Sequence, residues 1–191
     1  LIKESQKDTI RVWVAGCATG EEAYTISMIL HRILSEQNIT KHIQIFATDI
    51  SEDAIAKARN AQFTYEEVEA IDKYYLDKYF IRHEHTYEIK KSIRDSVIFS
   101  KHDLIRDPAF LNIDLISCRN LLIYFDANLQ KRVFSIFHHS LNRTGLLFLG
   151  KSESIGSLPE LFIQQSQRWK IFKKDPTASN MNFQNLMHYP R

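Results

Sequence analysis

Three short segments of this sequence carry glycine, acidic and amide residues at spacings that suit a ligand site. The first reads A-G-C-A-T-G-E-E at residues 15–22, where Gly16 and Gly20 allow the backbone to approach a ligand closely. No G-K-[ST] follows and the full G-x-G-x-x-G pattern is absent, which excludes a Walker loop and a complete dinucleotide fingerprint. Glu21 and Glu22 would repel a pyrophosphate and favour an uncharged or cationic ligand, unless they only complement a helix dipole.

The other two segments each lie next to an apolar run. Asp49 comes 33 residues after Gly16, and an acidic residue there can bind both hydroxyls of a ribose; for Asp49 alone, a turn or N-cap aspartate is the more common reading. Residues 118–120 are Cys-Arg-Asn, and a buried guanidinium and amide beside a cleft need partners, which a small polar ligand supplies. Each signal is weak alone, but the three in this order predict one ligand site at the ends of parallel strands.

These segments need strands and helices to position them. Three strands are expected, at residues 10–14, 43–47 and 113–116. Apolar residues recur with a helical period over residues 21–37, and Ser51 suits the N-cap of a helix that reaches about residue 60. A strand, a helix and a second strand form a βαβ unit with parallel strands. The predicted fold class is therefore α/β, with a doubly wound sheet.

An insertion and an antiparallel edge complete the predicted fold. Residues 65–76 have a helical pattern, whereas residues 78–100 alternate with a period of two around His83-Glu84-His85, which predicts an inserted antiparallel hairpin that includes residues 97–99. Asp126 is a candidate cap for a helix over residues 127–141.

The last part of the chain is expected to close the domain. Gly145 should end the turn after the helix, and residues 146–150 and 169–172 should form a final pair of strands at an antiparallel edge. One domain is predicted over residues 1–176, followed by a polar tail or linker at residues 177–191.

Length and composition exclude several other classes of protein. The chain has 191 residues, 44% hydrophobic and 25% charged, as in an ordinary soluble globular protein. Its net charge of +2 does not favour nucleic-acid binding. Two separate cysteines, no membrane-length apolar run and no signal peptide indicate a cytoplasmic setting without membrane insertion. Because the chain begins with Leu1 and ends in a polar stretch, we expect it to be part of a longer protein.

Four longer blocks carry a resemblance to a known family. V-W-V-A-G-C-A-T-G-E-E-A-Y, F-A-T-D-I-S, C-R-N-L-L-I-Y-F-D and L-L-F-L-G-K-S-E-S together resemble CheR, the S-adenosylmethionine (SAM)-dependent methyltransferase of chemotaxis receptors. The likeness covers residues 11–173, and its final block is similar to CheR domains fused to other signalling modules. It implies a class I SAM-dependent methyltransferase fold, a Rossmann-like doubly wound sheet with an antiparallel C-terminal edge and a small inserted antiparallel β-subdomain.

The resemblance also implies roles for individual residues. Asp49 would bind the ribose, Asp103 and Leu104 would flank the adenine, and Tyr124 would face the transferring methyl group, although a core tyrosine is the alternative. The implied cofactor-binding residues are Gly16, Glu22, Asp49, Asp103, Leu104, Arg119 and Asn120. The implied catalytic residues are Tyr124 and Arg119. No metal is implied, and the histidine pairs His83-x-His85 and His138-His139 lack a nearby set of Cys or acidic ligands.

The implied reaction methylates glutamate side chains of chemotaxis receptors, giving γ-methyl esters and S-adenosylhomocysteine (SAH). Because the reference pKa of glutamate is about 4.3, the nucleophile is already ionised and needs no general base. The implied partners are the cytoplasmic domains of methyl-accepting receptors and fused signalling domains, with no nucleic acid. Full-length relatives complete the site with an N-terminal Asn-x-Thr-x-Phe-Phe-Arg segment that is absent here, so low activity is expected of this chain alone.

Two other functions remain open at this stage. The first is a non-catalytic module that binds SAM or SAH, or only docks, within a fused signalling protein. The second is a class I methyltransferase that acts on a small molecule. The predicted hairpin favours a protein substrate over a small one, because an exposed strand edge can bind a protein partner by strand addition.

Overall fold

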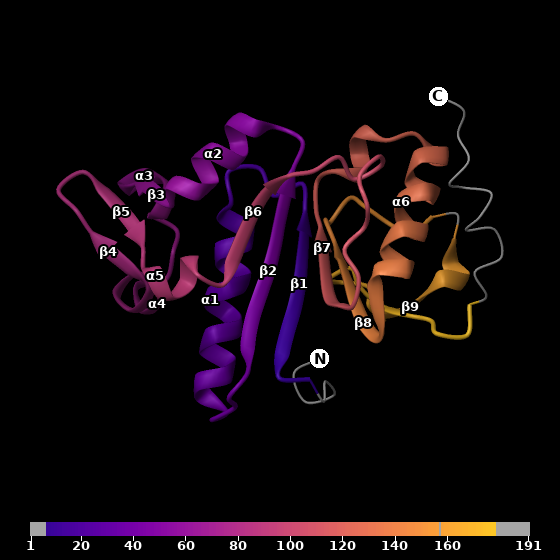
Figure 1. Cartoon of the computed structure of the whole chain (residues 1–191), viewed down its shortest axis with the longest axis horizontal. Helices are drawn as coiled ribbons and strands as arrows, with labels where there is room; N and C mark the ends of the chain where they lie inside the picture. Colours follow the sequence, from indigo (N-terminus) through magenta and orange to yellow (C-terminus); the bar gives the residue numbers. More distant parts are fainter. Residues whose placement is uncertain (1–6, 157, 179–191) are drawn as a thin grey trace. The chain divides into compact units, whose positions relative to one another are not determined.

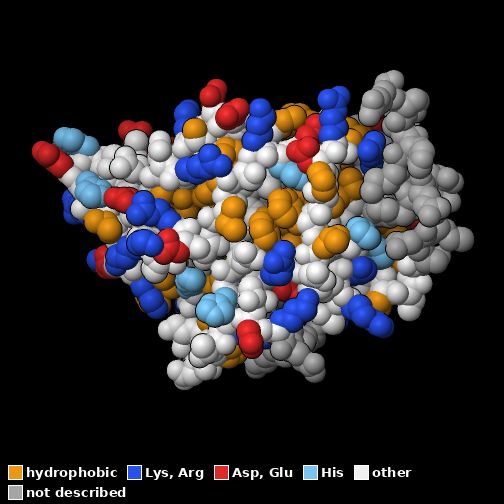
Figure 2. Space-filling model, viewed as in Figure 1, with side chains coloured by type: hydrophobic (Ala, Val, Ile, Leu, Met, Phe, Trp, Pro, Cys, Tyr) orange, Lys and Arg blue, Asp and Glu red, His pale blue; other side chains and the backbone are white. Residues whose placement is uncertain are grey.

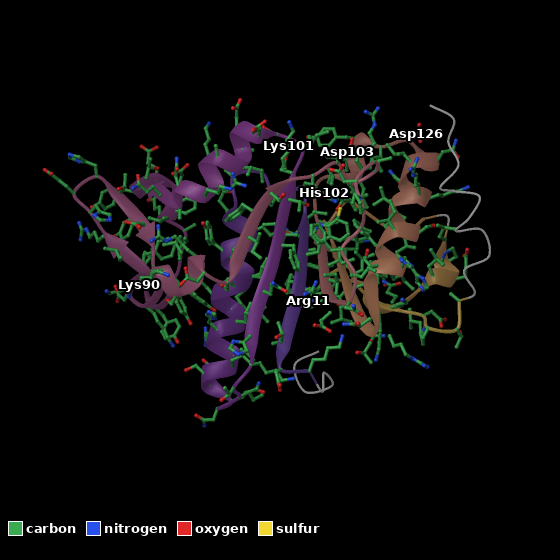
Figure 3. All side chains as sticks on the ribbon, viewed as in Figure 1. Arg11, Lys90, Lys101, His102, Asp103 and Asp126 are labelled. Carbon is green, nitrogen blue, oxygen red and sulfur yellow. The ribbon has the colours of Figure 1, made fainter. Side chains whose placement is uncertain are left out.

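The computed structural model describes residues 7–156 and 158–178 of the chain (Figure 1). These residues belong to two compact units, of which one is Lys7–His102 and the other begins at Asp103. Figure 3 labels His102 and Asp103, where the chain passes from the first unit to the second. Both units contain strands and helices, and each unit is described by itself below.

The first unit is built on three parallel strands, β1 (Thr9–Ala15), β2 (His42–Asp49) and β6 (Val97–Lys101). They are arranged in the order β6-β2-β1, so β2 pairs with a strand on each side. Helix α1 (Glu21–Glu36) connects β1 to β2 and packs against β2 and β6, while α2 (Glu52–Asn60) follows β2 and packs against the same two strands. The predicted βαβ unit is thus confirmed, with α1 and α2 close to their expected bounds.

Two local features fix where these helices begin. Gly20 is the N-cap of α1 in a left-handed conformation (φ 96°), and a Cβ there would lie 2.9 Å from Ala58 Cβ and 3.0 Å from the Phe99 ring. Only glycine therefore allows α1 to begin so close to α2 and β6. Ser51 caps α2 as predicted, because its side-chain oxygen accepts a hydrogen bond from the Ala54 N–H at 3.2 Å.

A small antiparallel sheet is inserted between α2 and β6. Its strands β3 (Gln62–Thr64), β4 (Phe80–Arg82) and β5 (Thr86–Ile89) lie in the order β3-β5-β4, so β3 and β4 are its edges. Figure 2 shows Lys, Arg, Asp, Glu and His side chains gathered over this end of the first unit. The predicted hairpin is present as β4 and β5. Placing residues 97–99 in it was wrong, because they belong to β6 and pair with β2.

Three short helices accompany the small sheet, α3 (Tyr65–Val68), α4 (Lys73–Tyr79) and α5 (Lys91–Arg94). The single helix predicted over residues 65–76 is in fact α3 and α4, because Asp72 starts a new helix by accepting the Tyr74 N–H at 2.8 Å. Lys90, labelled in Figure 3, stabilises the end of α4 by donating from Nζ to the carbonyl oxygens of Asp77 and Lys78. Lys90, which lies between β5 and α5, therefore ties the end of the hairpin to the end of α4.

The second unit contains β7 (Ile113–Cys118), β8 (Leu141–Leu149), β9 (Phe162–Ser166) and β10 (Ile171–Lys174). Their order is β7-β8-β10-β9; β7 and β8 are parallel, and β10 is antiparallel to both of its neighbours. The predicted antiparallel C-terminal edge is confirmed, although β9 was not foreseen. Gly145 lies inside β8, so its predicted role in a turn was wrong; the chain enters β8 directly at the end of the preceding helix.

That helix is α6 (Ala127–Ser140), which connects β7 to β8 after the single-turn η1 (Leu122–Tyr124). Asp126, labelled in Figure 3 at the start of α6, accepts the Leu129 N–H at 2.8 Å, as predicted for a cap. One face of α6 is apolar and buried through Val133, Phe134 and Phe137. A second single turn, η2 (Pro159–Leu161), precedes β9. Residues 177 and 178 of the predicted tail are described, and residues 179–191 lie outside the described part.

Candidate functional site

The loop after β1 is held by the end of β2. Gly16 has a positive φ of 73°, and the N–H groups of Gly16 and Cys17 both donate to the Thr48 carbonyl, at 2.8 and 2.9 Å. Ala18 also has a positive φ, 46°, which is uncommon for a residue with a Cβ. The loop is thus a fixed turn in which Gly16 is partly exposed, as expected for a backbone that a ligand approaches.

Asp49 ties this loop to the start of α2. Its Oδ2 accepts a hydrogen bond from the Ala18 N–H at 2.9 Å, and its Oδ1 accepts one from the Ser51 N–H at 2.9 Å. The second bond is that of a turn aspartate, which was the alternative reading of this residue. A carboxylate has about four acceptor positions, so Asp49, which is partly exposed, can also accept from ligand hydroxyls. The structure therefore brings Gly16 and Asp49 together at one edge of the first unit.

Glu22 and Glu21 lie in the first turn of α1 and differ in their surroundings. The Glu21 carboxylate accepts a short hydrogen bond of 2.6 Å from the Thr19 hydroxyl and is exposed. Glu22 is partly buried. Burial, with Asp49 nearby, raises the pKa of the buried Cys17 thiol to about 12, so this thiol is protonated at neutral pH. Cys17 therefore packs as a small apolar side chain and is a poor nucleophile.

In the second unit, Arg119 and Asn120 follow β7. The Arg119 guanidinium lies over the ring of Phe148 in β8, 5.1 Å from its centroid, and the side chain is half-buried. Asn120 has a positive φ of 58° and is exposed, which corrects the expectation of a buried amide. At Gly150 a Cβ would lie 2.8 Å from Asn120 Oδ1 and 3.1 Å from Asn120 N. The absence of a side chain at Gly150 thus lets Asn120 pack against the end of β8.

Tyr124 is the last residue of η1 and is 78% exposed. The alternative reading of Tyr124 as a core tyrosine is therefore wrong. Because the apolar run 121–125 forms a single turn and not a strand, it buries Leu122 and presents Tyr124 to solvent. The Tyr124 side chain is therefore accessible to a substrate.

Asp103 begins a turn at the start of the second unit. Its Oδ1 accepts the N–H groups of Ile105 and Arg106 at 2.9 and 3.2 Å, and its own N–H donates to Asp107 Oδ2 at 2.8 Å. Both Asp103 and Leu104 are partly exposed. The Asp103 side chain thus shapes the turn that presents Leu104, which is compatible with the predicted contact to an adenine and does not test it.

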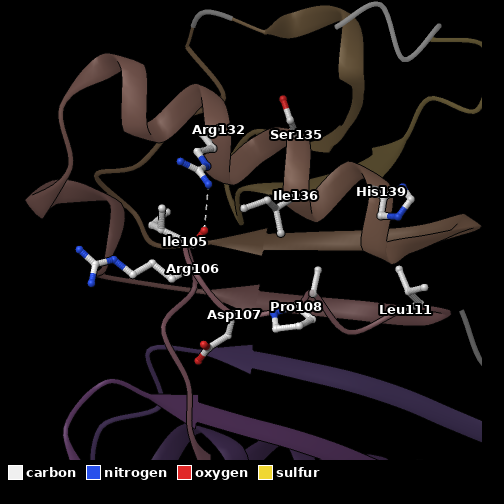
Figure 4. Close-up of a pocket in the computed structure, with 10 residues that line it drawn as sticks. Ile105, Arg106, Asp107, Pro108, Leu111, Arg132, Ser135, Ile136 and His139 are labelled. Atoms are coloured by element: carbon white, nitrogen blue, oxygen red, sulfur yellow. Dashed lines mark hydrogen bonds between the residues drawn. The ribbon is translucent and has the colours of Figure 1, made fainter. Parts of the chain in front are cut away.

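A cavity of about 460 Å³ lies in the same unit, between α6 and the segment that follows the Asp103 turn (Figure 4). Arg132, Ser135, Ile136 and His139 of α6 line one side, and Ile105, Pro108 and Leu111 lie opposite; Arg132 Nη2 donates to the Ile105 carbonyl at 3.1 Å. None of the predicted cofactor-binding residues lines this cavity. Cavity volume alone therefore does not identify the site that the sequence predicted.

The structure also shows a residue that the sequence analysis missed. Glu153 is only 4% exposed, and its carboxylate accepts three backbone N–H groups, from Leu121, Leu122 and Gly150, at 3.0, 2.9 and 2.7 Å. A glutamate in K-S-E-S after an apolar strand is a weak signal, because charged residues at strand ends are usually exposed. Its position shows that the C-R-N and K-S-E-S blocks meet in space.

Comparisons with known proteins identify the family of this chain. A family model described as the CheR methyltransferase, SAM binding domain, matches residues 1–171. The chain belongs to the CheR methyltransferase family. Together with the parallel strands and the antiparallel edge, this confirms the predicted α/β fold of class I SAM-dependent methyltransferases.

Several curated relatives of this CheR chain are similar over most of its length. Putative methyltransferase Cher3 of Pseudomonas putida is 34% identical over 176 residues, covering 87% of this chain and 63% of that protein. The chemotaxis protein methyltransferase of Escherichia coli is 32% identical over 171 residues, covering 86% and 59%. An uncharacterized 104.1 kDa protein of Rhodobacter capsulatus is 36% identical over 165 residues, covering 86% and 17%. The CheR chain thus spans less than two thirds of each of these relatives.

Solved structures similar to the CheR chain have much lower sequence identity. PKMT2 from Rickettsia typhi in complex with AdoHcy matches with a TM-score of 0.48 and 13% identity, covering 78% of this chain and 21% of that one. A SAM-dependent methyltransferase from Mesorhizobium loti matches with a TM-score of 0.42 and 16% identity, covering 78% and 50%. In the described part of the CheR chain, no helix is both long and apolar enough to cross a membrane.

Proposed function

We propose that this chain transfers a methyl group from SAM to glutamate side chains of chemotaxis receptors, forming γ-glutamyl methyl esters in sensory adaptation. The observation that carries the proposal is the CheR family match over residues 1–171. Relatives named chemotaxis protein methyltransferase support the receptor as partner. The large Rhodobacter capsulatus relative supports fusion to further domains.

The residues at the end of β2 fit the adenosine part of SAM. Asp49 is anchored by two backbone N–H groups, at Ala18 and Ser51, so its orientation is set before a ligand binds. Its remaining acceptor positions suit the two ribose hydroxyls, and an anchored acceptor loses little entropy on binding. Glu22, in the first turn of α1, adds negative charge that suits a cationic ligand. Gly16 supplies backbone beside them, and Leu104 and Asp103 are proposed to flank the adenine.

Arg119, Asn120 and Tyr124 are the proposed contacts on the second unit. Asn120 is exposed, with an amide that can both donate and accept, and Arg119 is steadied by the ring of Phe148. The exposed Tyr124 is proposed to orient the incoming carboxylate by donating its hydroxyl. Arg119 is proposed to assist by attracting the substrate carboxylate to the site with its guanidinium group.

The proposed chemistry requires positioning more than acid–base catalysis. SAM, when bound, supplies an electrophilic methyl group on a sulfonium. A substrate glutamate is ionised at neutral pH, so no residue of the chain has to remove a proton from it. The protonated Cys17 thiol does not compete for the methyl group, because its pKa is raised to about 12. The chain is therefore expected to contribute by orienting the carboxylate and excluding water.

A transfer assay tests this function directly. The chain is incubated with methyl-labelled SAM and the purified cytoplasmic domain of a receptor, and label released as methanol by mild alkali is counted. A γ-glutamyl ester gives alkali-labile label that disappears when the receptor glutamates are changed to glutamine. SAM binding without any transfer, even after an upstream Asn-x-Thr-x-Phe-Phe-Arg segment is added, would instead support a non-catalytic module. Transfer to a small molecule but not to receptor would support the other alternative.

A further inference from the structure

Residues 118–125, called here the C-R-N segment, run from the end of β7 through η1. Two side chains from elsewhere in the unit bind its backbone. Glu153, which is 4% exposed, accepts the N–H groups of Leu121 and Leu122 with one carboxylate oxygen, Oε1, at 3.0 and 2.9 Å. Its other oxygen, Oε2, accepts the Gly150 N–H at 2.7 Å. The carboxylate thus joins the C-R-N segment to the end of β8.

The second side chain is Gln130 of α6. Its Nε2 donates to the carbonyl oxygens of Leu122 and Phe125, at 2.9 and 3.0 Å. Leu122 therefore has its N–H bound by Glu153 and its carbonyl bound by Gln130. The single turn η1 within this segment cannot satisfy the N–H groups at its start by internal hydrogen bonds, so these groups need other partners when they are buried.

Burying a carboxylate costs free energy, which the three hydrogen bonds from backbone N–H groups offset. We take a buried carboxylate at this place as a sign that the conformation of the C-R-N segment matters for function. The conformation here is unusual: Asn120 has a left-handed φ of 58°, and Tyr124 is 78% exposed although Leu122, two residues earlier, is 2% exposed. Gly150 is equally constrained, because a Cβ there would lie 2.7 Å from Glu153 Oε2 and 2.8 Å from Asn120 Oδ1. The Glu153 carboxylate and the Asn120 side chain therefore both pack against the backbone of Gly150.

We propose that Glu153 is a positioning residue that, together with Gln130, holds the C-R-N segment in the conformation that presents Arg119, Asn120 and Tyr124 to the ligands. This inference rests on the proposed function, because those residues are the proposed contacts. Glu153 acts through the segment and touches neither SAM nor substrate. Its two oxygens serve different partners, one the C-R-N segment and the other the end of β8, so both must be acceptors at once.

Glu153→Gln tests this requirement with almost no change in size. An amide has one acceptor oxygen, so it can accept either from the Leu121 and Leu122 N–H groups or from the Gly150 N–H. Its NH₂ group then faces the remaining N–H donors and cannot accept a hydrogen bond from them. Glu160→Gln is the matched control, because Glu160 is exposed in the same unit. Phe172→Leu is the stability control, since it removes buried volume from β10 without touching the three hydrogen bonds.

The readouts are the Kd for SAH by calorimetry, the KM for SAM and the melting temperature of each variant. We expect Glu153→Gln to weaken SAH binding and raise the KM by roughly tenfold, the effect of a few misplaced hydrogen bonds. Phe172→Leu should lower the melting temperature while binding SAH as the parent does. A merely structural role for Glu153 would make both variants alike in binding, and that result overturns the proposal.

Further outcomes separate this proposal from the proposed function. If the parent fails to bind SAH, the proposed function fails and the positioning role falls with it. If the parent binds and Glu153→Gln binds equally well, the positioning role alone is overturned. If Glu153→Gln does not fold, Gln130→Met decides, because it removes only the donor on the carbonyl side: weaker SAH binding or a lower kcat supports the proposal, and parental values overturn it.

Discussion

Replacing Asp49 by asparagine tests the most specific cofactor contact that we propose. The substitution keeps the size of the side chain and removes its charge and one acceptor oxygen. In the structure the two oxygens of Asp49 accept from Ala18 and Ser51, so the asparagine can keep one of these bonds and must turn its NH₂ towards the other N–H. Asp49→Asn therefore perturbs the loop after β1 modestly and the ribose contacts more strongly.

The size of the effect follows from the hydrogen bonds lost. Bonds from ribose hydroxyls to a carboxylate contribute about 1.5–3 kcal/mol each, against about 0.5–1.5 kcal/mol for a neutral acceptor. The net loss is then about 1–1.5 kcal/mol per hydroxyl and about 2–3 kcal/mol for two, or roughly 30- to 150-fold in Kd. Because Asp49 is partly exposed and water competes for it, we expect a smaller loss than this, roughly tenfold.

Calorimetric titration of each variant with SAH measures this loss. Asp53→Asn is the matched control, because Asp53 is exposed in the first turn of α2, four residues after Asp49. Urea unfolding of both variants separates loss of binding from loss of stability. If Asp49→Asn binds SAH as tightly as the parent and as Asp53→Asn, the assignment of Asp49 to the ribose is refuted.

Three further predictions follow from the described residues. Tyr124→Phe should lower kcat by roughly three- to tenfold, the effect of losing one hydroxyl hydrogen bond. The melting temperature should not change, because the side chain is 78% exposed, and an unchanged kcat would exclude a role for the hydroxyl in catalysis. Ile81→Lys adds charge to the exposed edge strand β4 and should reduce methylation of receptor protein without changing the Kd for SAH; loss of both would make the hairpin structural. Burial lowers the pKa of His138, so below about pH 6.5 the unfolded chain binds the proton more readily and the free energy of unfolding should fall. His138→Gln, which can still donate to the Asp175 carbonyl, should flatten that fall in urea unfolding, and an equal fall in the variant would contradict it.

The helices that could be predicted are those whose signals are local. Ser51 and Asp126 precede their helices directly, and both accept the N–H three residues later, so the cap is visible in the sequence. Residues 65–76 show the opposite case. Their apolar period continues across Asp72, but that residue caps a new helix, and period alone cannot distinguish one helix from two.

Strand partners were harder to predict because they lie far apart in the chain. The apolar, β-branched and aromatic run at residues 97–99 indicated a strand correctly, but β6 pairs with β2, about fifty residues earlier, and not with the nearby hairpin. The three-residue β3 is too short to show a pattern of its own. Gly145 looked like a turn residue because glycine so often ends helices, yet it lies inside β8.

The residues of the candidate site also differ in whether a local sequence pattern points to them. Gly16, Asp49, Arg119 and Asn120 could be proposed from the sequence because they follow strands in a recognisable order, and the structure places each of them after a strand or at its end. The anchoring of Asp49 by Ala18 could not, since it depends on the left-handed turn of that residue. Glu153 was missed because its burial results from contacts with a segment thirty residues earlier, which no local pattern records.

Equilibrium titration of the parent chain with SAH, followed by competition with SAM, tests the central claim most directly. The account predicts saturable binding of one SAH per chain that SAM competes for, because Asp49 and the C-R-N segment are already ordered without ligand. Binding should also raise the melting temperature in proportion to the logarithm of ligand concentration above the Kd. The absence of saturable binding, or binding that SAM does not displace, would contradict the assignment of these residues to a methyl-donor site.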